Sequence, residues 1–108
     1  MGEELEVSVK ELKRKIDSGI KFRLIDVREP HEFNLCHIIG CDLIPLAQIP
    51  MRMKEFSREG EYIFYCHTGN RSGEVAKYLR QVGFKNVKSL KGGIDQWAVE
   101  IDPTLPRY

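Results

Sequence analysis

The stretch YIFYCHTGNRSGEVAKYL, residues 62–79, joins an apolar run to a segment of helical periodicity through a cysteine and a short polar loop. The unbroken apolar residues 62–65 are typical of a strand that is buried on both faces. Residues 72–82 carry apolar side chains at helical spacing. The stretch therefore predicts a strand, a tight loop and a helix, with Cys66 at the carboxyl end of the strand.

The same alternation of apolar runs and helical segments continues on both sides of this stretch. Ser8 and Glu11 form a capping-box pattern at the start of a helix that Gly19 ends. Trp97 stands at helical spacing from Ile94 and Ile101, which places it in the core. The further predicted elements are a strand over 22–27, a short helix over 30–35, a strand over 41–44, an amphipathic helix over 48–56, a strand over 87–90 and a helix after Gly92-Gly93.

Strands that alternate with helices over short connections predict an α/β fold, a parallel sheet with helices on both faces. In such sheets the ligand crevice lies beyond the carboxyl ends of the strands. Asp26 and Arg28 follow one predicted strand and Cys66 follows another, so both groups are expected at that crevice.

Composition and charge exclude several classes of function. The 108 residues are 42% hydrophobic, as expected for one soluble domain, and Lys+Arg 17 against Asp+Glu 16 leaves a formal charge of +1. No basic surface for nucleic acid, no membrane span and no signal peptide is predicted, and Cys 3 is an odd count that suits a reducing compartment. We therefore expect a cytoplasmic protein. Cys36, His37 and Cys41 do not have zinc-site spacing, so no metal is expected.

The loop after the predicted strand has the residues of an anion-binding site. Backbone N–H groups at the start of a helix favour a negative charge, and the thiolate of Cys66 is the nearest anion. Gly69 permits positive φ and Asn70 tolerates similar turns, while Ser72 is expected to cap the helix. Arg71 offers a planar guanidinium for an oxyanion.

Four segments, LIDVREPHEF, HIIGCDLIPL, YCHTGNRS and LKGGIDQW, resemble in order and spacing the rhodanese family of sulfurtransferases. The resemblance covers nearly the whole chain and implies a single rhodanese-like domain over 1–108, a three-layer α/β fold with a central five-stranded parallel sheet. It implies that Cys66 is the catalytic residue and carries a persulfide, without a cofactor. Asp26 and Arg28 are expected to support the site, and the residues expected to bind substrate are His67, Thr68, Gly69, Asn70, Arg71 and Ser72. Cys41 stands where the family usually has a small apolar residue.

The reaction that the resemblance implies moves a sulfane sulfur from a donor such as thiosulfate to Cys66, and then to cyanide, a thiol or a sulfur-carrier protein. The expected partners are thus a small donor and acceptor, a sulfur-carrier protein or a persulfide donor enzyme. No nucleic acid or membrane partner is expected. His67 is expected to be an exposed loop side chain that tunes local charge.

Three alternatives remain open from the sequence. The domain could bind a partner or a persulfide without turnover. It could be a phosphatase of the Cdc25 type, although such enzymes resemble a longer loop, and here only four residues separate Cys66 from Arg71. Cys36 or Cys41 could also resolve a Cys66 persulfide as an internal disulfide, which requires sulfur atoms within bonding reach.

Overall fold

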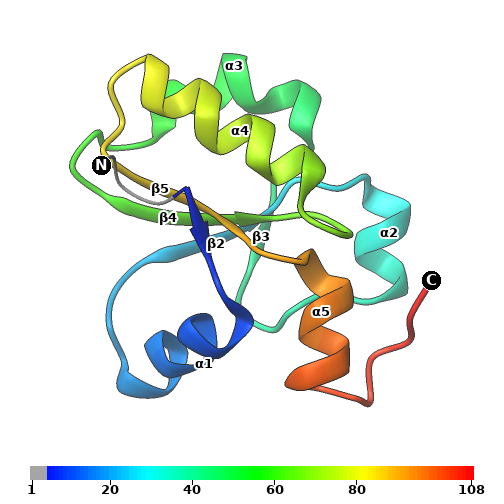
Figure 1. Cartoon of the computed structure of the whole chain (residues 1–108). Helices are drawn as coiled ribbons and strands as arrows, with labels where there is room; N and C mark the ends of the chain where they lie inside the picture. Colours follow the sequence, from blue (N-terminus) through cyan, green and yellow to red (C-terminus); the bar gives the residue numbers. More distant parts are fainter. Residues whose placement is uncertain (1–4) are drawn as a thin grey trace.

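A parallel five-stranded sheet forms the centre of the protein (Figure 1), as the sequence predicted. The computed structural model describes residues 5–108. The strand order is β1-β5-β4-β2-β3, and every neighbouring pair is parallel. The strands are β1 (Glu6–Val7), β2 (Arg23–Asp26), β3 (Asp42–Leu43), β4 (Glu61–Tyr65) and β5 (Asn86–Leu90).

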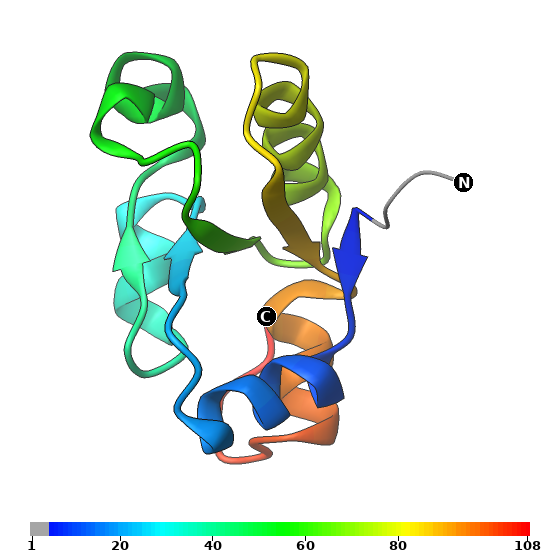
Figure 2. The ribbon, with the colours of Figure 1, turned by 90° about the vertical axis from the view of Figure 1, so that its left-hand side faces the viewer.

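Helices cover both faces of the sheet, so the α/β assignment is confirmed (Figure 2). The helices are α1 (Val9–Ser18), α2 (Pro30–Leu35), α3 (Ile49–Arg52), α4 (Asn70–Gln81) and α5 (Gly93–Glu100). α3 and α4 pack on one face and α1 and α5 on the other (Figures 1 and 2). Each face has its own apolar core, and Trp97 and Ile94 lie in the core beneath α1 and α5, as predicted.

Local sequence signals explain where most elements begin and end. Both hydrogen bonds of the Ser8–Glu11 capping box are present at the start of α1, and Gly19 ends that helix in the left-handed conformation. The helix predicted over 30–35 matches α2, with Pro30 in its first turn. The observed strands differ from the predicted ones only by a few residues at their ends.

Two elements differ from the sequence predictions. Residues 48–56 do not form one amphipathic helix, because α3 is a single turn between the 3₁₀ helices η1 (Leu46–Gln48) and η2 (Met53–Glu55). Pro50 lies in the first turn of α3, where a proline is tolerated because that N–H has no partner in the helix, so it marks where α3 begins. Strand β1 was not found from the pattern, because two residues are too few to show a period.

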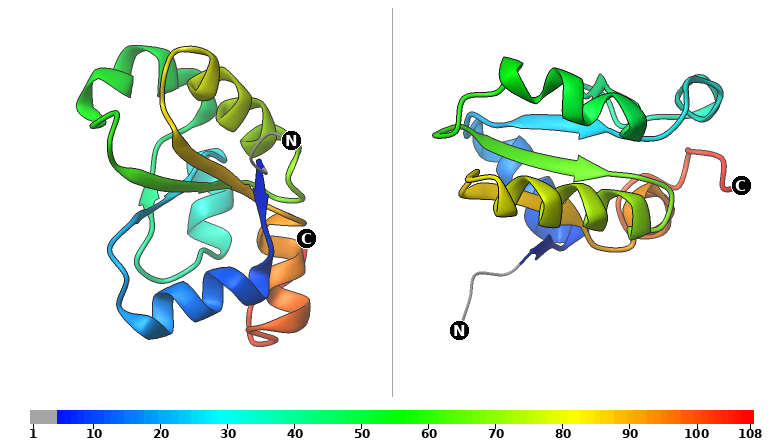
Figure 3. Two further views of the ribbon diagram at one scale, coloured as in Figure 1. Left: turned by 60° about the vertical axis from the view of Figure 1, so that its left-hand side comes forward. Right: turned by 90° about the horizontal axis from the view of Figure 1, so that it is seen from above.

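The sheet brings the loops that follow β2 and β4 together. Asp26 is the register partner of Tyr65, and the N–H of Val27 donates to the carbonyl of Tyr65 at 3.0 Å. Cys66 therefore lies beside the segment that carries Arg28. α2, the start of α4 and the C-terminal segment gather at this same end of the strands (Figure 3, right).

Within residues 5–108, no helix is both long enough and apolar enough to cross a bilayer.

Gly93 should be essential for stability because its backbone lies against the loop that carries Cys66. Its φ is +61°, and a Cβ at this position would lie 2.4 Å from the carbonyl oxygen of His67 and 2.5 Å from that of Cys66. We expect Gly93→Ala to lower the free energy of unfolding by about 2–4 kcal/mol, measured by urea denaturation. Gly73→Ala is the matched control, since its Cβ meets nothing within 4 Å. That control should be neutral or stabilising by up to about 1 kcal/mol, and equal losses in both variants would contradict the prediction.

Candidate functional site

The sulfur of Cys66 lies in a pocket of backbone N–H groups at the carboxyl end of β4. The residue is 1% exposed, and its Sγ accepts hydrogen bonds from the N–H of Gly69 at 3.1 Å and the N–H of Ser72 at 3.4 Å. The second donor belongs to the first turn of α4, whose N–H groups have no partner inside the helix. The positive end of the helix dipole adds to the same field. Backbone N–H groups of the loop therefore face the sulfur, which is the geometry of an anion-binding site.

The loop takes this shape because the carbonyl groups of Cys66 and His67 are hydrogen-bonded to the start of α5, and so are turned away from the sulfur. The N–H groups of Ile94 and Asp95, at the start of α5, donate to the carbonyls of Cys66 and His67 at 2.9 and 3.0 Å. With the carbonyls turned toward α5, the N–H groups that follow can face the sulfur. Gly69 completes the turn at φ +112°, a conformation that other residues rarely adopt.

Ser72 does not cap α4, so that prediction is wrong. The cap position is Gly69, and the helix begins at Asn70, two residues earlier than expected. The buried Ser72 hydroxyl instead lies 3.4 Å from Sγ of Cys66 and 2.7 Å from the hydroxyl of Ser89 on β5. Ser72 therefore contributes its N–H and its hydroxyl to the surroundings of the sulfur.

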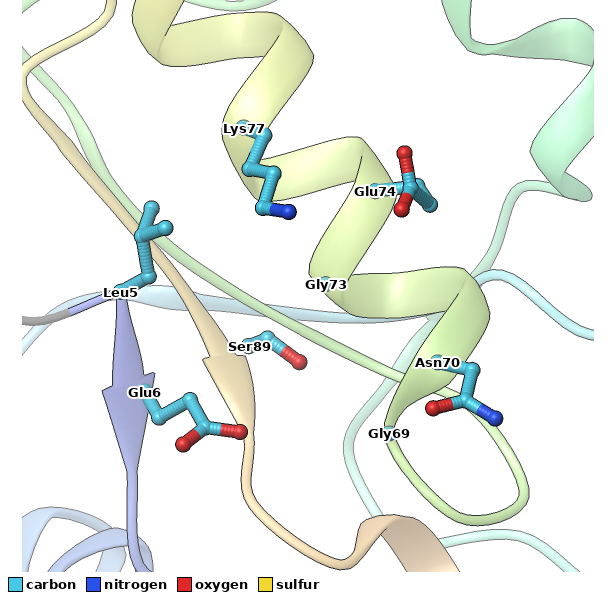
Figure 4. A pocket seen from close by; sticks show the side chains of 8 residues that line it. All are labelled: Leu5, Glu6, Gly69, Asn70, Gly73, Glu74, Lys77 and Ser89. Carbon is cyan, nitrogen blue, oxygen red and sulfur yellow. The ribbon is translucent and has the colours of Figure 1, made fainter.

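A groove flanks the loop on the side of β1 and β5 (Figure 4). Its volume is about 440 Å³, and Ser89 lies in it between β5 and the first turn of α4. The groove is lined by Leu5, Glu6, Gly69, Asn70, Gly73, Glu74, Lys77 and Ser89. Asn70, predicted to bind substrate, lines this groove, and its substrate-binding role stays a prediction.

The guanidinium of Arg71 is paired with the carboxylate of Glu32 from α2. Two parallel hydrogen bonds of 2.9 and 3.0 Å join them, in the fork geometry that arginine favours with carboxylates. The hydrogen bonds from Arg71 are the main cause that lowers the pKa of Glu32 to about 2, so the carboxylate is ionised at neutral pH. The role expected for Arg71, binding a donor anion, stays a prediction.

Asp26 and Arg28 form a fully buried ion pair behind the loop. Nε and Nη2 of Arg28 donate to the two carboxylate oxygens of Asp26 at 2.9 and 2.7 Å, and Nη2 also donates to the carbonyl of Cys36. Both side chains have no exposed surface. Burial acts to lower the pKa of Arg28, but its bonds to Asp26 and Tyr108 outweigh it and raise the pKa above its ordinary value. Among residues 5–108 no hydrogen bond joins this pair to Cys66, and the supporting role expected of it stays a prediction.

The C-terminal segment covers the outer side of the loop. The ring of Tyr108 stacks on His67 with centroids 4.0 Å apart, and Arg107 pairs with Asp95 at 2.9 Å. His67, Thr68, Asp95, Arg107 and Tyr108 line a shallow pocket of about 320 Å³. His67 is therefore half-covered by an aromatic ring, and Thr68 is the exposed residue at the tip of the loop.

The other two cysteines lie on the opposite face of the sheet from Cys66. Cys66 packs in the core under α3 and α4, whereas Cys36 belongs to the core under α1 and α5 and Cys41 packs against that core. All three are free thiols. Burial raises the pKa of Cys41, whose Sγ lies 3.3 Å from the hydroxyl of Tyr65. This placement argues against Cys36 or Cys41 as a resolving partner for Cys66.

The sequence pattern did not indicate three residues of the site, namely Glu32, Ser89 and Tyr108. Glu32 belongs to the segment LIDVREPHEF, and its place three residues after Glu29 is that of a capping-box residue. Nothing in the sequence pattern marked Ser89 or Tyr108. Together the site offers a buried sulfur nucleophile, backbone donors for a negative charge on it, and a charge-paired arginine at its edge.

Comparisons with known proteins agree with this geometry. The model of the rhodanese-like domain matches residues 8–100. A Mycobacterium tuberculosis protein named as a probable adenylyltransferase/sulfurtransferase, MoeZ, is 36% identical over 104 residues, which cover 94% of this chain and 26% of the relative. YtwF of Bacillus subtilis, named as a candidate sulfurtransferase, is 39% identical over 98 residues, covering 91% of this chain and 94% of the relative. The chain thus spans about a quarter of the length of the mycobacterial relative and nearly all of the other.

Solved structures agree as well. The crystal structure of SSP1007 from Staphylococcus saprophyticus superposes with a TM-score of 0.81 at 33% identity, covering 89% of this chain and 95% of that one. Because the family model spans most of the sequence and the fold matches, the chain belongs to the family of rhodanese-like domains.

Proposed function

We propose that the protein is a sulfurtransferase that carries a sulfane sulfur as a persulfide on Cys66. The observation that supports this most directly is the pair of backbone N–H groups, from Gly69 and Ser72, that meet at Sγ of Cys66. A thiolate needs such donors to stay ionised in a buried position, and a persulfide needs them for its terminal sulfur. The names of the relatives MoeZ and YtwF include sulfur transfer, which supports the same reaction class.

The reaction consists of two displacements. The thiolate of Cys66 attacks the outer sulfur of a donor such as thiosulfate, the sulfur–sulfur bond of the donor breaks, and sulfite leaves with the electron pair. Cyanide or a thiol, such as a cysteine thiol of a sulfur-carrier protein, then attacks the terminal sulfur; the sulfur–sulfur bond on Cys66 breaks and the Cys66 thiolate leaves. Sulfite leaves as a stable anion, so no general acid is required at the first step.

Two other functions make different demands on the same site. A binding module would take up sulfur or a partner without turnover. Only a sulfurtransferase would then carry out the second displacement, the transfer of sulfur from Cys66 to an acceptor. A phosphatase must place a tetrahedral phosphate over the cysteine, and the four-residue spacing between Cys66 and Arg71 leaves a small ring for it. The bidentate contact with Glu32 also engages the arginine that such a reaction would need.

Cys66 should be the only residue that accepts sulfur. After incubation with thiosulfate, intact-protein mass spectrometry should detect one added sulfur atom on the wild type and none on Cys66→Ser. The variant should also produce no thiocyanate from cyanide. Cys41→Ala is the control, because Cys41 packs on the other face of the sheet, and it should still gain sulfur. Continued turnover by Cys66→Ser would refute the proposal, and loading without any thiocyanate would favour the binding module.

Arg71 should matter more for loading than for transfer, because only the loading step binds a sulfonate. Arg71→Ala removes a charge-assisted contact and leaves Glu32 uncompensated, so thiosulfate loading should slow by about one to two orders of magnitude. Transfer from preloaded protein to a small neutral thiol should change much less, and Arg71→Lys should recover part of the loading rate. Single-turnover measurements separate the two steps. Equal slowing of both would instead identify Arg71 as a brace for the loop.

The protein should not hydrolyse aryl phosphates, because the short loop is too narrow for the transferred group. The assay is release of the phenol at neutral pH by a preparation that has been shown to load sulfur. Hydrolysis that disappears in Cys66→Ser would overturn the assignment in favour of phosphoryl transfer.

A further inference from the structure

Arg71 borders the entrance to the Cys66 loop, which we call the mouth, and its positive charge is already compensated by a carboxylate. The side chain of Arg71 is 35% exposed and that of Glu32 is 12% exposed, and two hydrogen bonds join them. A second ion pair, between Arg107 and Asp95, lies beside the same loop. Because Arg71 and Arg107 each have an acidic partner, neither arginine offers an uncompensated positive charge to an incoming anion.

Glu32 is fixed in place by contacts other than Arg71. One of its carboxylate oxygens accepts the N–H of Glu29 at 3.0 Å, and the other accepts the hydroxyl of Tyr108 at 3.0 Å. Its pKa of about 2, lowered chiefly by the hydrogen bonds from Arg71, keeps it negative at every pH at which the protein would be assayed. Glu32 therefore cannot turn away from the loop without losing bonds on two further sides.

Tyr108 connects this carboxylate to the buried interior. Its hydroxyl accepts from Nη1 of Arg28 at 2.6 Å and donates to Glu32, while its ring stacks on His67. Arg28 is itself held by Asp26 with no exposed surface. A chain of contacts thus runs from the buried ion pair through Tyr108 and Glu32 to the guanidinium at the mouth.

This geometry bears on the choice of sulfur donor. Thiosulfate is a dianion whose sulfonate would have to share Arg71 with a fixed carboxylate, and Coulomb repulsion between like charges is strong near a partly buried group. A persulfide carries a single negative charge, and its leaving group is a thiolate. Both donors deliver the same sulfane sulfur to Cys66. The charges at the mouth can therefore make the rate of loading from one donor differ from the rate of loading from the other.

We propose that Glu32, held by Tyr108, determines donor specificity and favours a thiol-bound persulfide over thiosulfate. This inference rests on the proposed persulfide chemistry at Cys66. In the favoured step the Cys66 thiolate attacks the outer sulfur of R–S–S⁻, a new sulfur–sulfur bond forms on Cys66, the donor bond breaks, and R–S⁻ leaves. Charge and atoms balance, and no oxidant or reductant is consumed. Glu32 touches neither sulfur and acts through Arg71 as a positioning residue.

The test compares two donors in single-turnover loading, namely thiosulfate and 2-hydroxyethyl persulfide, which has no charge besides that of the persulfide. Glu32→Gln removes the negative charge but keeps an oxygen that can accept the N–H of Glu29. We expect this variant to load from thiosulfate roughly tenfold faster than the wild type, since a unit charge near the donor is lost. Loading from the persulfide should change by less than about threefold. The ratio of the two rates is insensitive to a general loss of folded protein.

Glu55→Gln is the matched control. Glu55 also pairs with an arginine through two hydrogen bonds. It lies in η2, before the amino end of β4, and thus at the opposite end of the strands from Cys66. Its substitution should leave the donor ratio unchanged. Tyr108→Phe keeps the ring that stacks on His67 and removes the hydroxyl that holds Glu32, so it should shift the ratio in the same direction by a smaller factor.

The outcomes distinguish this inference from the proposed function. A donor ratio that is unchanged in Glu32→Gln, or thiosulfate loading that falls in parallel with persulfide loading, overturns the role of Glu32 while persulfide formation on Cys66 stands. A wild-type protein that gains no sulfur from either donor refutes the proposed function, and the inference with it. A further check is ionic strength: the gain in Glu32→Gln should shrink at high salt, because salt screens the repulsion between Glu32 and a donor that approaches from solvent.

Discussion

The orientation of four peptide groups decides what the site can do. The carbonyls of Cys66 and His67 point away from the sulfur because the first N–H groups of α5 bind them, at 2.9 and 3.0 Å. Only then can the N–H groups of Gly69 and Ser72 converge on Sγ. A loop with the same residues but free carbonyls would present oxygen atoms to the sulfur and oppose a negative charge. The N–H contacts of the Cys66 sulfur thus depend on a helix that begins almost thirty residues later in the chain.

Behind the loop lies the buried ion pair between Asp26 and Arg28. Burying an ion pair is costly, and removing one partner of such a pair typically costs about 3–5 kcal/mol. Here each guanidinium nitrogen of Arg28 donates to an acceptor, namely the carboxylate of Asp26, the carbonyl of Cys36 or the hydroxyl of Tyr108. The pair therefore serves less as a source of stability than as a rigid anchor for segments that come from different parts of the sequence.

The sequence predicted the strand–loop–helix unit around Cys66 well, because periodicity and glycine placement are local signals. It failed where the decisive contact is distant: Arg71 and Glu32 are 39 residues apart, and Tyr108 lies 76 residues from Glu32. It also misplaced Ser72, since a serine near a helix start suits a cap by propensity, while here its hydroxyl turns inward to the sulfur and to Ser89. Single-sequence patterns carry no information on such pairings.

The division of the thiols between two cores has a chemical consequence. The sequence has three cysteines, all of them in the described part of the chain, and the sheet separates Cys66 from Cys36 and Cys41. A sulfenic acid or persulfide on Cys66 thus has no thiol on its own face of the fold with which to form a disulfide. Recovery of the free thiol then depends on an acceptor from another molecule, so the lifetime of the modified protein is set by the concentration of acceptors around it.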